Sequence, residues 1–254
     1  MEEKIAAQNL RRYSLIGIPV DHLKKDFFEH VLTKLLNDKS VHQISIITLW
    51  EVIRAKFSRK YRKCLHKSSL VIPKTAGVAR GIKFIYGRKI DTYTSFDFLI
   101  KLLGIIEKRS GAIYLLGSDG KYLSVAENNI KETFPGARIV GRYTGRFPKK
   151  MAGNIIMAIR KSAPDLFLAG AGIPGKDLWV YQHKKSFSPG LFLWNQESFD
   201  IFSGRRKKIS KSLSQNGLDF LPVLFKKPWR LIRIFPYFLY VIILFFQKIR
   251  PRAR

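Results

Sequence analysis

The segment Gly117-Ser118-Asp119-Gly120 lies between a buried apolar stretch and a predicted helix, and it could bind a phosphate group. Glycines in such a loop let the backbone approach a phosphate, and the first turn of the helix offers free N–H groups and a partial positive charge. Glycine also ends strands for turn reasons alone, and Asp119 also suits the N-cap position of the helix. The loop is therefore a candidate phosphate site whose motif is weak on its own.

Several other kinds of chemistry are not indicated. The five histidines show no metal-ligand spacing, and we find no P-loop and no Ser-His-Asp order. Cys64 is the single cysteine, which excludes an intramolecular disulfide and a cysteine-based metal cluster. Nothing beside Cys64 suggests that it acts as a nucleophile, so we expect an inert thiol.

Positive charge is concentrated in two regions of the 254-residue chain, whose formal net charge is +29. Residues 52–90 contain twelve Lys and Arg and no acid, and residues 205–254 contain thirteen against one acid, Asp219. Such a surface should attract phosphates on a lipid, a nucleic acid or a diphosphate substrate, unless it is simply a solvated basic face. Apolar residues make up 46% of the chain, which is enough for a folded core and excludes a disordered chain.

Strand-like and helix-like segments alternate along the chain. The predicted strands cover 12–20, 42–49, 70–72, 112–116, a short stretch from 139, 165–169 and 191–194. The predicted helices cover 21–37, 50–67, 96–108, 121–133, 152–161 and 178–185. This alternation predicts an α/β fold, a Rossmann-like and mainly parallel sheet with helices on both faces. Ligands bind such sheets at the carboxyl ends of the strands, which directs attention to the loops after Leu49, Ile72, Leu116, Ala169 and Trp194.

The end of the chain differs from the rest. Residues 217–233 are basic with an amphipathic pattern, and residues 234–247 are almost wholly apolar between flanking Lys and Arg. Fourteen apolar residues fall short of the roughly twenty that span a bilayer, and Pro236 weakens the helix. We therefore predict a core over 1–204 and, over 205–254, a basic appendage with an apolar segment at the membrane interface. The alternatives for the apolar segment are a core helix or a contact between subunits. A homo-oligomer is therefore also possible.

The order of four segments is more specific than any one motif. Residues 115–147, 162–180, 198–208 and 216–233 resemble, in order and spacing, the WecG/TagA/CpsF family of bacterial glycosyltransferases. The resemblance extends from about Ser14 to Arg233. It implies transfer of a sugar, typically N-acetylmannosamine, from a UDP-sugar donor to a polyprenyl-diphosphate-linked sugar. It also implies no metal or other cofactor, a Rossmann-like core, and an appendage that docks on the inner face of the cytoplasmic membrane.

On the donor side the resemblance implies substrate binding by residues that this chain keeps. They are Gly117, Ser118 and Gly120 in the first loop, Gly145 in a Gly-x-Phe stretch, and Asp200 in a Phe-Asp motif. Two appendage arginines that would hold a diphosphate, Arg230 and Arg233, are also kept, whereas a third is Val223.

On the acceptor side the agreement is partial. Thr48 matches the family's Thr-x-Asn, but the Asn is Trp50. The family's proposed general base, an Asp, is Lys74 here, and its Pro-Lys-Gln-Glu motif is replaced by Pro174-Gly175-Lys176-Asp177. The resemblance thus assigns catalytic positions to Thr48, Lys74 and Asp177 and a substrate contact to Lys176.

The absence of the Asp matters because transfer to a hydroxyl needs a proton acceptor, and general-base assistance is worth roughly 10²–10⁴-fold. A protonated Lys74 cannot accept a proton, although it could stabilise a leaving diphosphate. Asp177, Asp91 and His66 are alternative bases that the sequence does not rank. Either the mechanism has shifted or catalysis has been lost.

We carry two hypotheses from this point. The first is a glycosyltransferase of envelope polysaccharide or glycolipid synthesis, peripheral on the inner face of the cytoplasmic membrane, since residues 1–10 show no secretory signal. The alternative is a catalytically inactive relative that binds a lipid-diphosphate sugar or a partner transferase. Nucleic-acid binding explains the charge but neither the motif order nor the apolar tail, so we expect no nucleic-acid partner.

Overall fold

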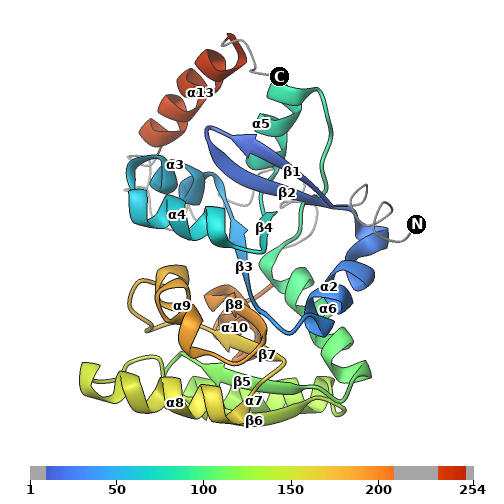
Figure 1. Cartoon of the computed structure of the whole chain (residues 1–254), viewed down its shortest axis with the longest axis vertical. Coiled ribbons are helices and arrows are strands. Elements are labelled where there is room, and N and C mark those ends of the chain that lie inside the picture. The colour runs from blue at the N-terminus through green and yellow to red at the C-terminus, as the bar shows by residue number, and fades with distance from the viewer. Residues whose placement is uncertain (1–9, 209–233, 250–254) are drawn as a thin grey trace.

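The computed structural model describes residues 10–208 and 234–249, with side chains from 238 onward in the second range. Its centre is a six-stranded sheet in the order β4-β3-β8-β7-β5-β6, in which every neighbouring pair is parallel (Figure 1). The strands are β3 (Val41–Ile47), β4 (Leu70–Pro73), β5 (Ala112–Leu116), β6 (Arg138–Tyr143), β7 (Leu166–Ala169) and β8 (Gly190–Trp194). The predicted parallel α/β sheet is confirmed.

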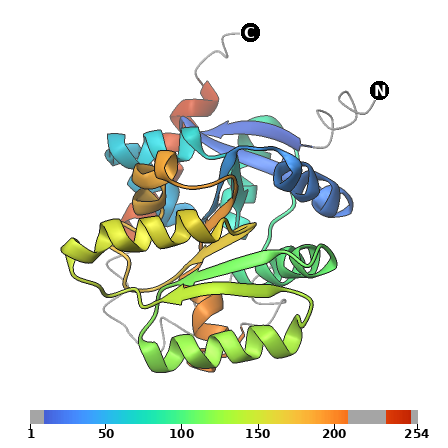
Figure 2. The same cartoon turned by 60° about the horizontal axis from the view of Figure 1, so that its bottom comes forward.

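Helices cover both faces of this sheet. The helices of the described residues are α2 (Phe28–Asn37), α3 (Leu49–Phe57), α4 (Arg59–Lys67), α5 (Ala76–Tyr86), α6 (Ser95–Lys108), α7 (Gly120–Thr133), α8 (Ala152–Ser162), α9 (Asp177–His183), α10 (Gln196–Phe202) and α13 (Ile234–Ile249), of which α13 packs on other helices. Short 3-10 turns occupy Lys25–Phe27, Lys149–Met151 and Lys184–Ser186. Figure 2 shows α7 and α8 on opposite faces of β5 and β6.

The two faces arise from the alternation of side chains along each strand. Leu166 and Leu168 of β7 join the apolar cluster beneath α2, α6, α7 and α10, whereas Phe167 joins the cluster beneath α8 and α9. All four residues of β7 are buried, so the central strands have no exposed face. Polar chemistry is therefore confined to the loops at the strand ends.

The prediction of a single strand over 12–20 is wrong. The chain forms an antiparallel hairpin of β1 (Leu10–Leu15) and β2 (Ile18–Leu23), and helix α2 begins only at Phe28. Ile16 and Gly17 form the two-residue turn with φ of 55° and 75°, the left-handed backbone that such hairpins require. The buried Asp21 accepts hydrogen bonds from Arg12 (2.7 Å) and from the backbone N–H of Val71 (2.7 Å), which ties the hairpin to the edge strand β4.

Two helices also differ from the prediction. The segment 50–67 is split into α3 and α4, because the Ser58 hydroxyl caps the second helix by accepting from the Tyr61 N–H (3.3 Å). The segment after Pro73, predicted as a loop, contains α5. Its glycines obscured the pattern, yet one is needed: a Cβ on Gly81 would lie 2.1 Å from the Tyr240 hydroxyl oxygen.

Helix α13 packs beside α5 and α3 at one end of the molecule (Figure 1). Tyr240 and Leu244 are buried in the same cluster as the hairpin. The Gln247 side chain accepts from the Ile16 N–H (2.7 Å) and donates to the Ser14 carbonyl oxygen (3.1 Å). Within the residues described, no helix is long and apolar enough to span a membrane.

The loops after β5, β6 and β7 pack backbone against backbone. Ser118 donates its N–H to the Ala171 carbonyl oxygen (2.8 Å), and Gly145 donates to that of Ser118 (3.0 Å). A Cβ on Gly145 would lie 1.9 Å from the Ala171 carbonyl oxygen. No side chain fits there, so these glycines bring the three loops together.

Gly145→Ala should therefore lower the free energy of unfolding by roughly 1–3 kcal/mol, the usual effect of overpacking. Gly104→Ala is the matched control, because a Cβ at this position in α6 meets nothing within 4 Å. That control should be neutral or more stable by about 0.5–1 kcal/mol. Urea denaturation of both variants measures the difference, and equal stabilities would contradict the packing described.

Candidate active site

The carboxyl ends of the parallel strands meet at one edge of the sheet, and most of the predicted site residues follow them directly. Lys74 follows β4, Thr48 follows β3, and Gly117 and Ser118 follow β5. Gly145 comes shortly after β6, and Lys176 lies in the loop between β7 and α9. The fold thus gathers residues that are far apart in the sequence.

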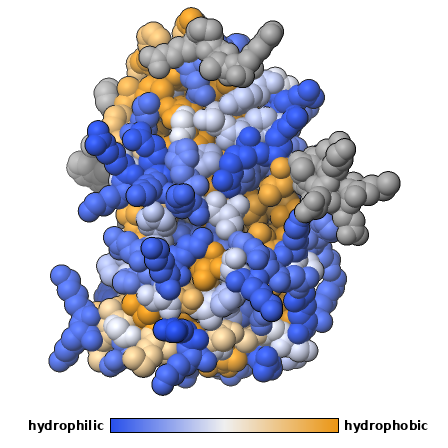
Figure 3. Space-filling view, in the orientation of Figure 1, coloured by the Kyte–Doolittle hydropathy of each residue, from blue (hydrophilic) through white to orange (hydrophobic). Residues whose placement is uncertain are grey.

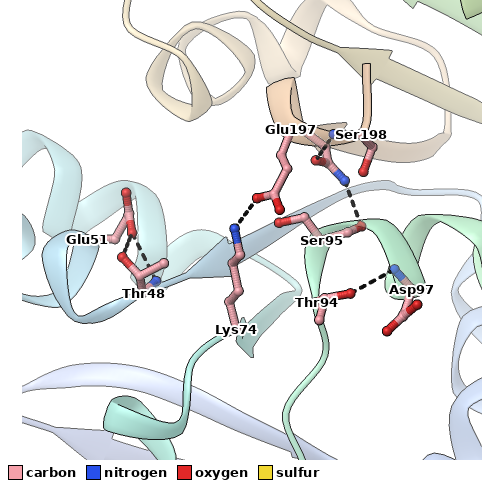
Figure 4. Close-up of polar contacts among 9 residues, drawn as sticks. Thr48, Glu51, Lys74, Thr94, Ser95, Asp97, Glu197 and Ser198 are labelled. Atoms are coloured by element: carbon pink, nitrogen blue, oxygen red, sulfur yellow. Dashed lines mark hydrogen bonds and ion pairs between the residues drawn. The ribbon is translucent and has the colours of Figure 1, made fainter. Parts of the chain in front are cut away.

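Lys74 forms an ion pair with Glu197, which lies in the first turn of α10 after β8 (Figure 4). The two side chains are 20% and 14% exposed, so the pair is largely shielded from water. Strand β3 lies between β4 and β8 in the sheet, and the Lys74 side chain reaches across its end to Glu197. The sequence analysis missed Glu197, although it pointed to the loop after Trp194 that carries it.

The backbone around Glu197 is fixed by a hydrogen-bonded cap. Asn195 accepts from the Ser198 N–H (3.1 Å) and donates to the Ser95 carbonyl oxygen (2.9 Å), which joins α10 to the start of α6 (Figure 4). The start of α6 is itself capped, because the Thr94 hydroxyl accepts from the Asp97 N–H (3.0 Å). Glu197 therefore projects from a rigid part of the edge.

Thr48 has a structural task in this arrangement. Its hydroxyl accepts from the Trp50 N–H (3.2 Å) and donates to the Glu51 carboxylate, which also accepts from the Thr48 N–H (2.9 Å). This capping box starts α3. The Glu51 carboxylate is therefore occupied in capping the start of α3, beside Lys74.

Asp177 is enclosed rather than displayed at the edge. Its carboxylate accepts from the Tyr61 hydroxyl (3.3 Å), and its carbonyl oxygen accepts from the Gln43 side chain (3.0 Å). Burial, reinforced by the Glu51 charge, raises the pKa of Asp177 to about 7. The Asp177 side chain contacts α4 and its backbone contacts β3, whereas the Lys74 ammonium contacts Glu197.

Lys176, unlike its neighbour Asp177, lies at the end of β8. Its ammonium nitrogen lies 5.0 Å from the centre of the Trp194 ring, an attractive cation–π distance. Lys176 has a φ of 57°, which is costly for a residue with a side chain and typical of functional loops. The strain places a cation beside the loops that follow β7 and β8.

The predicted phosphate loop has fewer free groups than its glycines suggest. The N–H groups of Gly117, Ser118 and Gly145 all donate to backbone carbonyls. What remains is the start of α7, where a Cβ on Gly120 would meet only Thr144 at 3.9 Å, and the buried Ser118 hydroxyl, which has no partner among the described residues. The loop can therefore bind an anion through the helix terminus rather than through all its glycines.

Asp200 lies in α10, which packs against α7. The Arg205 guanidinium lies 5.0 Å from the centre of the Tyr122 ring, so the end of α10 approaches the start of α7. One carboxylate oxygen of Asp200 is buried without a hydrogen-bond donor in the described part of the chain. The structure thus brings the predicted donor residues of β5 and α10 into one region.

The other alternative bases lie with the hairpin. Asp91 pairs with His22 (3.3 Å) and Lys25 (4.0 Å), and the His66 ring contacts the Gly17 carbonyl oxygen (2.9 Å). Arg230 and Arg233, with Val223, lie outside the described residues.

A family model described as "Glycosyl transferase WecG/TagA/CpsF family" matches residues 13–254. The chain belongs to this family. Its Rossmann-like sheet agrees with the resemblance drawn from the sequence.

Two curated relatives have the same name, N-acetylglucosaminyldiphosphoundecaprenol N-acetyl-beta-D-mannosaminyltransferase. The protein of Bacillus subtilis (strain 168) is 21% identical over 211 residues, covering 83% of this chain and 78% of the relative. The protein of Bacillus spizizenii (strain W23) is 22% identical over 213 residues, covering 83% and 82%.

The buried Asp177 predicts a pH-dependent stability. Its pKa rises from 3.8 to about 7 on folding, so between these values the folded chain holds a proton that the unfolded chain has released. Stability from this group is therefore present below about pH 4 and is lost as the pH rises to 7. Asp177→Asn, which stays neutral, should gain stability relative to the parent between pH 5 and pH 8 in urea denaturation.

Glu29→Gln is the matched control for this experiment, because Glu29 is 60% exposed in a surface pair with Lys108. Its stability difference from the parent should stay flat over the same range. A flat difference for Asp177→Asn as well would show that Asp177 is ionised in the folded protein.

Proposed function

We propose that this protein transfers a hexose or N-acetylhexosamine, such as N-acetylmannosamine, from a UDP-sugar to a polyprenyl-diphosphate-linked sugar. The reaction would serve envelope polysaccharide or glycolipid biosynthesis. The observation that carries the proposal is that cations, carboxylates and a helix terminus converge at the carboxyl edge of a sheet in a chain that matches this family from residue 13 to 254. The names of the two relatives give the acceptor and the sugar of their own reaction, and this supports the proposal.

The donor diphosphate would lie at the start of α7. Free N–H groups in its first turn and the Ser118 hydroxyl can donate hydrogen bonds to phosphate oxygens, and the Lys176 ammonium can balance the charge that develops as UDP leaves. Arg230 and Arg233 would hold the acceptor diphosphate. In this proposal the protein supplies the positive charge from its own side chains, without a metal.

The lipid part of the acceptor would contact α13. On the face opposite Tyr240 and Leu244, this helix exposes Phe238, Val241, Ile242, Phe245, Phe246 and Ile249. Figure 3 shows apolar surface over α13 at the top of the molecule, with hydrophilic side chains beside it. An apolar face with basic neighbours suits the interface of an anionic bilayer. We infer a peripheral position on the inner face of the cytoplasmic membrane.

The function is tested by incubating the full chain with a panel of UDP-sugars and a synthetic polyprenyl-diphosphate N-acetylglucosamine, with and without EDTA. We expect a glycosylated lipid in both conditions. Tight binding of the lipid diphosphate without transfer from any donor would favour the inactive relative, which the presence of Lys74 makes the second candidate. Absence of both binding and transfer would refute the family-based function.

Gly120→Leu should abolish binding of the UDP-sugar donor, because the new side chain would cover the first turn of α7 while meeting little of the protein itself. Gly153→Leu is the matched control: Gly153 lies in the first turn of α8, and its Cβ would meet no atom within 4 Å. Titration calorimetry should show binding by the control and by the parent. Unchanged binding by Gly120→Leu would place the donor elsewhere.

Phe246→Asp should weaken binding to phosphatidylglycerol vesicles at least tenfold, since burying an aromatic side chain in an apolar phase is worth about 1.5–3 kcal/mol. Met157→Asp makes the same charge change at a side chain that is 54% exposed on α8, and it should bind like the parent. Vesicle sedimentation measures both. Equal losses would indicate that net charge, rather than the apolar face, determines binding.

A further inference from the structure

The described residues at the carboxyl edge include six carboxylates, and five of them have other roles or places. Glu51 is used in the capping box of α3, and Asp177 is enclosed against Tyr61. Asp97 pairs with Lys208 at the surface (2.8 Å). Asp119 and Asp200 belong to the α7 side, where the donor is proposed to bind. Glu197 remains, in contact with Lys74.

The ion pair leaves half of the Glu197 carboxylate free to react. Lys74 contacts Oε2, and no donor among the described residues reaches Oε1. The side chain is 14% exposed, so it is partly accessible, and its contact with Lys74 is at Oε2. A carboxylate with one oxygen held and one oxygen open is suited to accept a proton in a defined direction.

The surroundings hold Glu197 in place more firmly than an ordinary surface acid. Ser198 and Phe199, its neighbours in α10, are almost completely buried, and Asn195 joins the helix terminus to α6. Catalytic groups need this kind of support, because small displacements of a base cost large factors in rate.

We propose that Glu197 is the general base that accepts the proton of the attacking acceptor hydroxyl, and that Lys74 positions its carboxylate. The inference rests on the proposed transfer reaction. The family resemblance implies a carboxylate at position 74, and the ion pair returns a carboxylate to that place from α10, at the end of the Lys74 side chain.

In the proposed transfer step, the acceptor oxygen forms a bond to the anomeric carbon as the bond from that carbon to the diphosphate oxygen breaks. UDP leaves with the electron pair. The hydroxyl proton moves to Oε1 of Glu197 and is released to water before the next turnover. Lys74 stays protonated throughout and keeps its contact with Oε2.

Glu197→Gln tests the assignment in the full chain. We expect kcat to fall roughly 10²–10⁴-fold, the usual contribution of a general base. The KM for the UDP-sugar should change less than threefold, because the donor binds at α7. The decline of kcat at acid pH, which reports protonation of the base, should disappear. Glu29→Gln, the same change in an exposed ion pair, should leave kcat and its pH profile unchanged.

Two further variants separate a chemical role from a structural one. Glu197→Ala should regain at least tenfold activity with added formate, which supplies a mobile carboxylate. In the Glu197→Gln protein, the second change Lys74→Asp should also recover activity, since it places a carboxylate at the same site from β4.

Retention of more than a tenth of the parent kcat by Glu197→Gln, or an unchanged acid decline, would overturn the assignment while the transfer activity of the parent stands. If the parent itself transfers no sugar from any donor, the proposed function fails and the role of Glu197 fails with it. Circular dichroism and donor titration of each variant verify that the fold and the α7 site are intact.

Discussion

The central strands of the sheet are buried on both faces, and this constraint decides where the protein can do chemistry. Side chains of β7 alternate between two apolar clusters, so neither face can carry a charge without a large desolvation cost. Charged and hydrogen-bonding groups must then emerge where the strands end. Because the strands are parallel, their carboxyl ends share one edge, and most of the candidate site residues collect there.

At that edge the loops are held by two different kinds of contact. Around β5, β6 and β7, where the loops pack closely at Gly145, backbone N–H groups donate to backbone carbonyls and are not free to bind a ligand. Around β4, β3 and β8, side chains make the links: the Lys74–Glu197 pair, the Thr48 capping box and the Asn195 cap. The first region is held rigid by backbone contacts, and the second contains the ionisable groups.

The sequence predicted the strands of the parallel sheet well, because most of them are short, apolar and largely buried. The prediction failed where the type of a residue depends on a contact with a residue far away in the sequence. Helix α5 contains Gly81, whose partner Tyr240 is far away in the sequence. Glu197 was missed for the same reason, since an ion pair across 123 positions leaves no local spacing to recognise. Positive φ at Ile16 likewise concealed the hairpin turn.

Helix α5 connects the site with the apolar face of α13. It begins directly after Lys74, and Tyr240 packs against its glycines, with the hydroxyl 3.5 Å from the Gly77 carbonyl oxygen. Gln247 fixes the other end of α13 to the hairpin, which in turn is tied to β4 through Asp21. The exposed apolar face of α13 is thus attached to the strand that presents Lys74. The same contacts that bury one face of α13 set the direction in which its other face is presented, relative to the edge where a lipid-linked sugar would react.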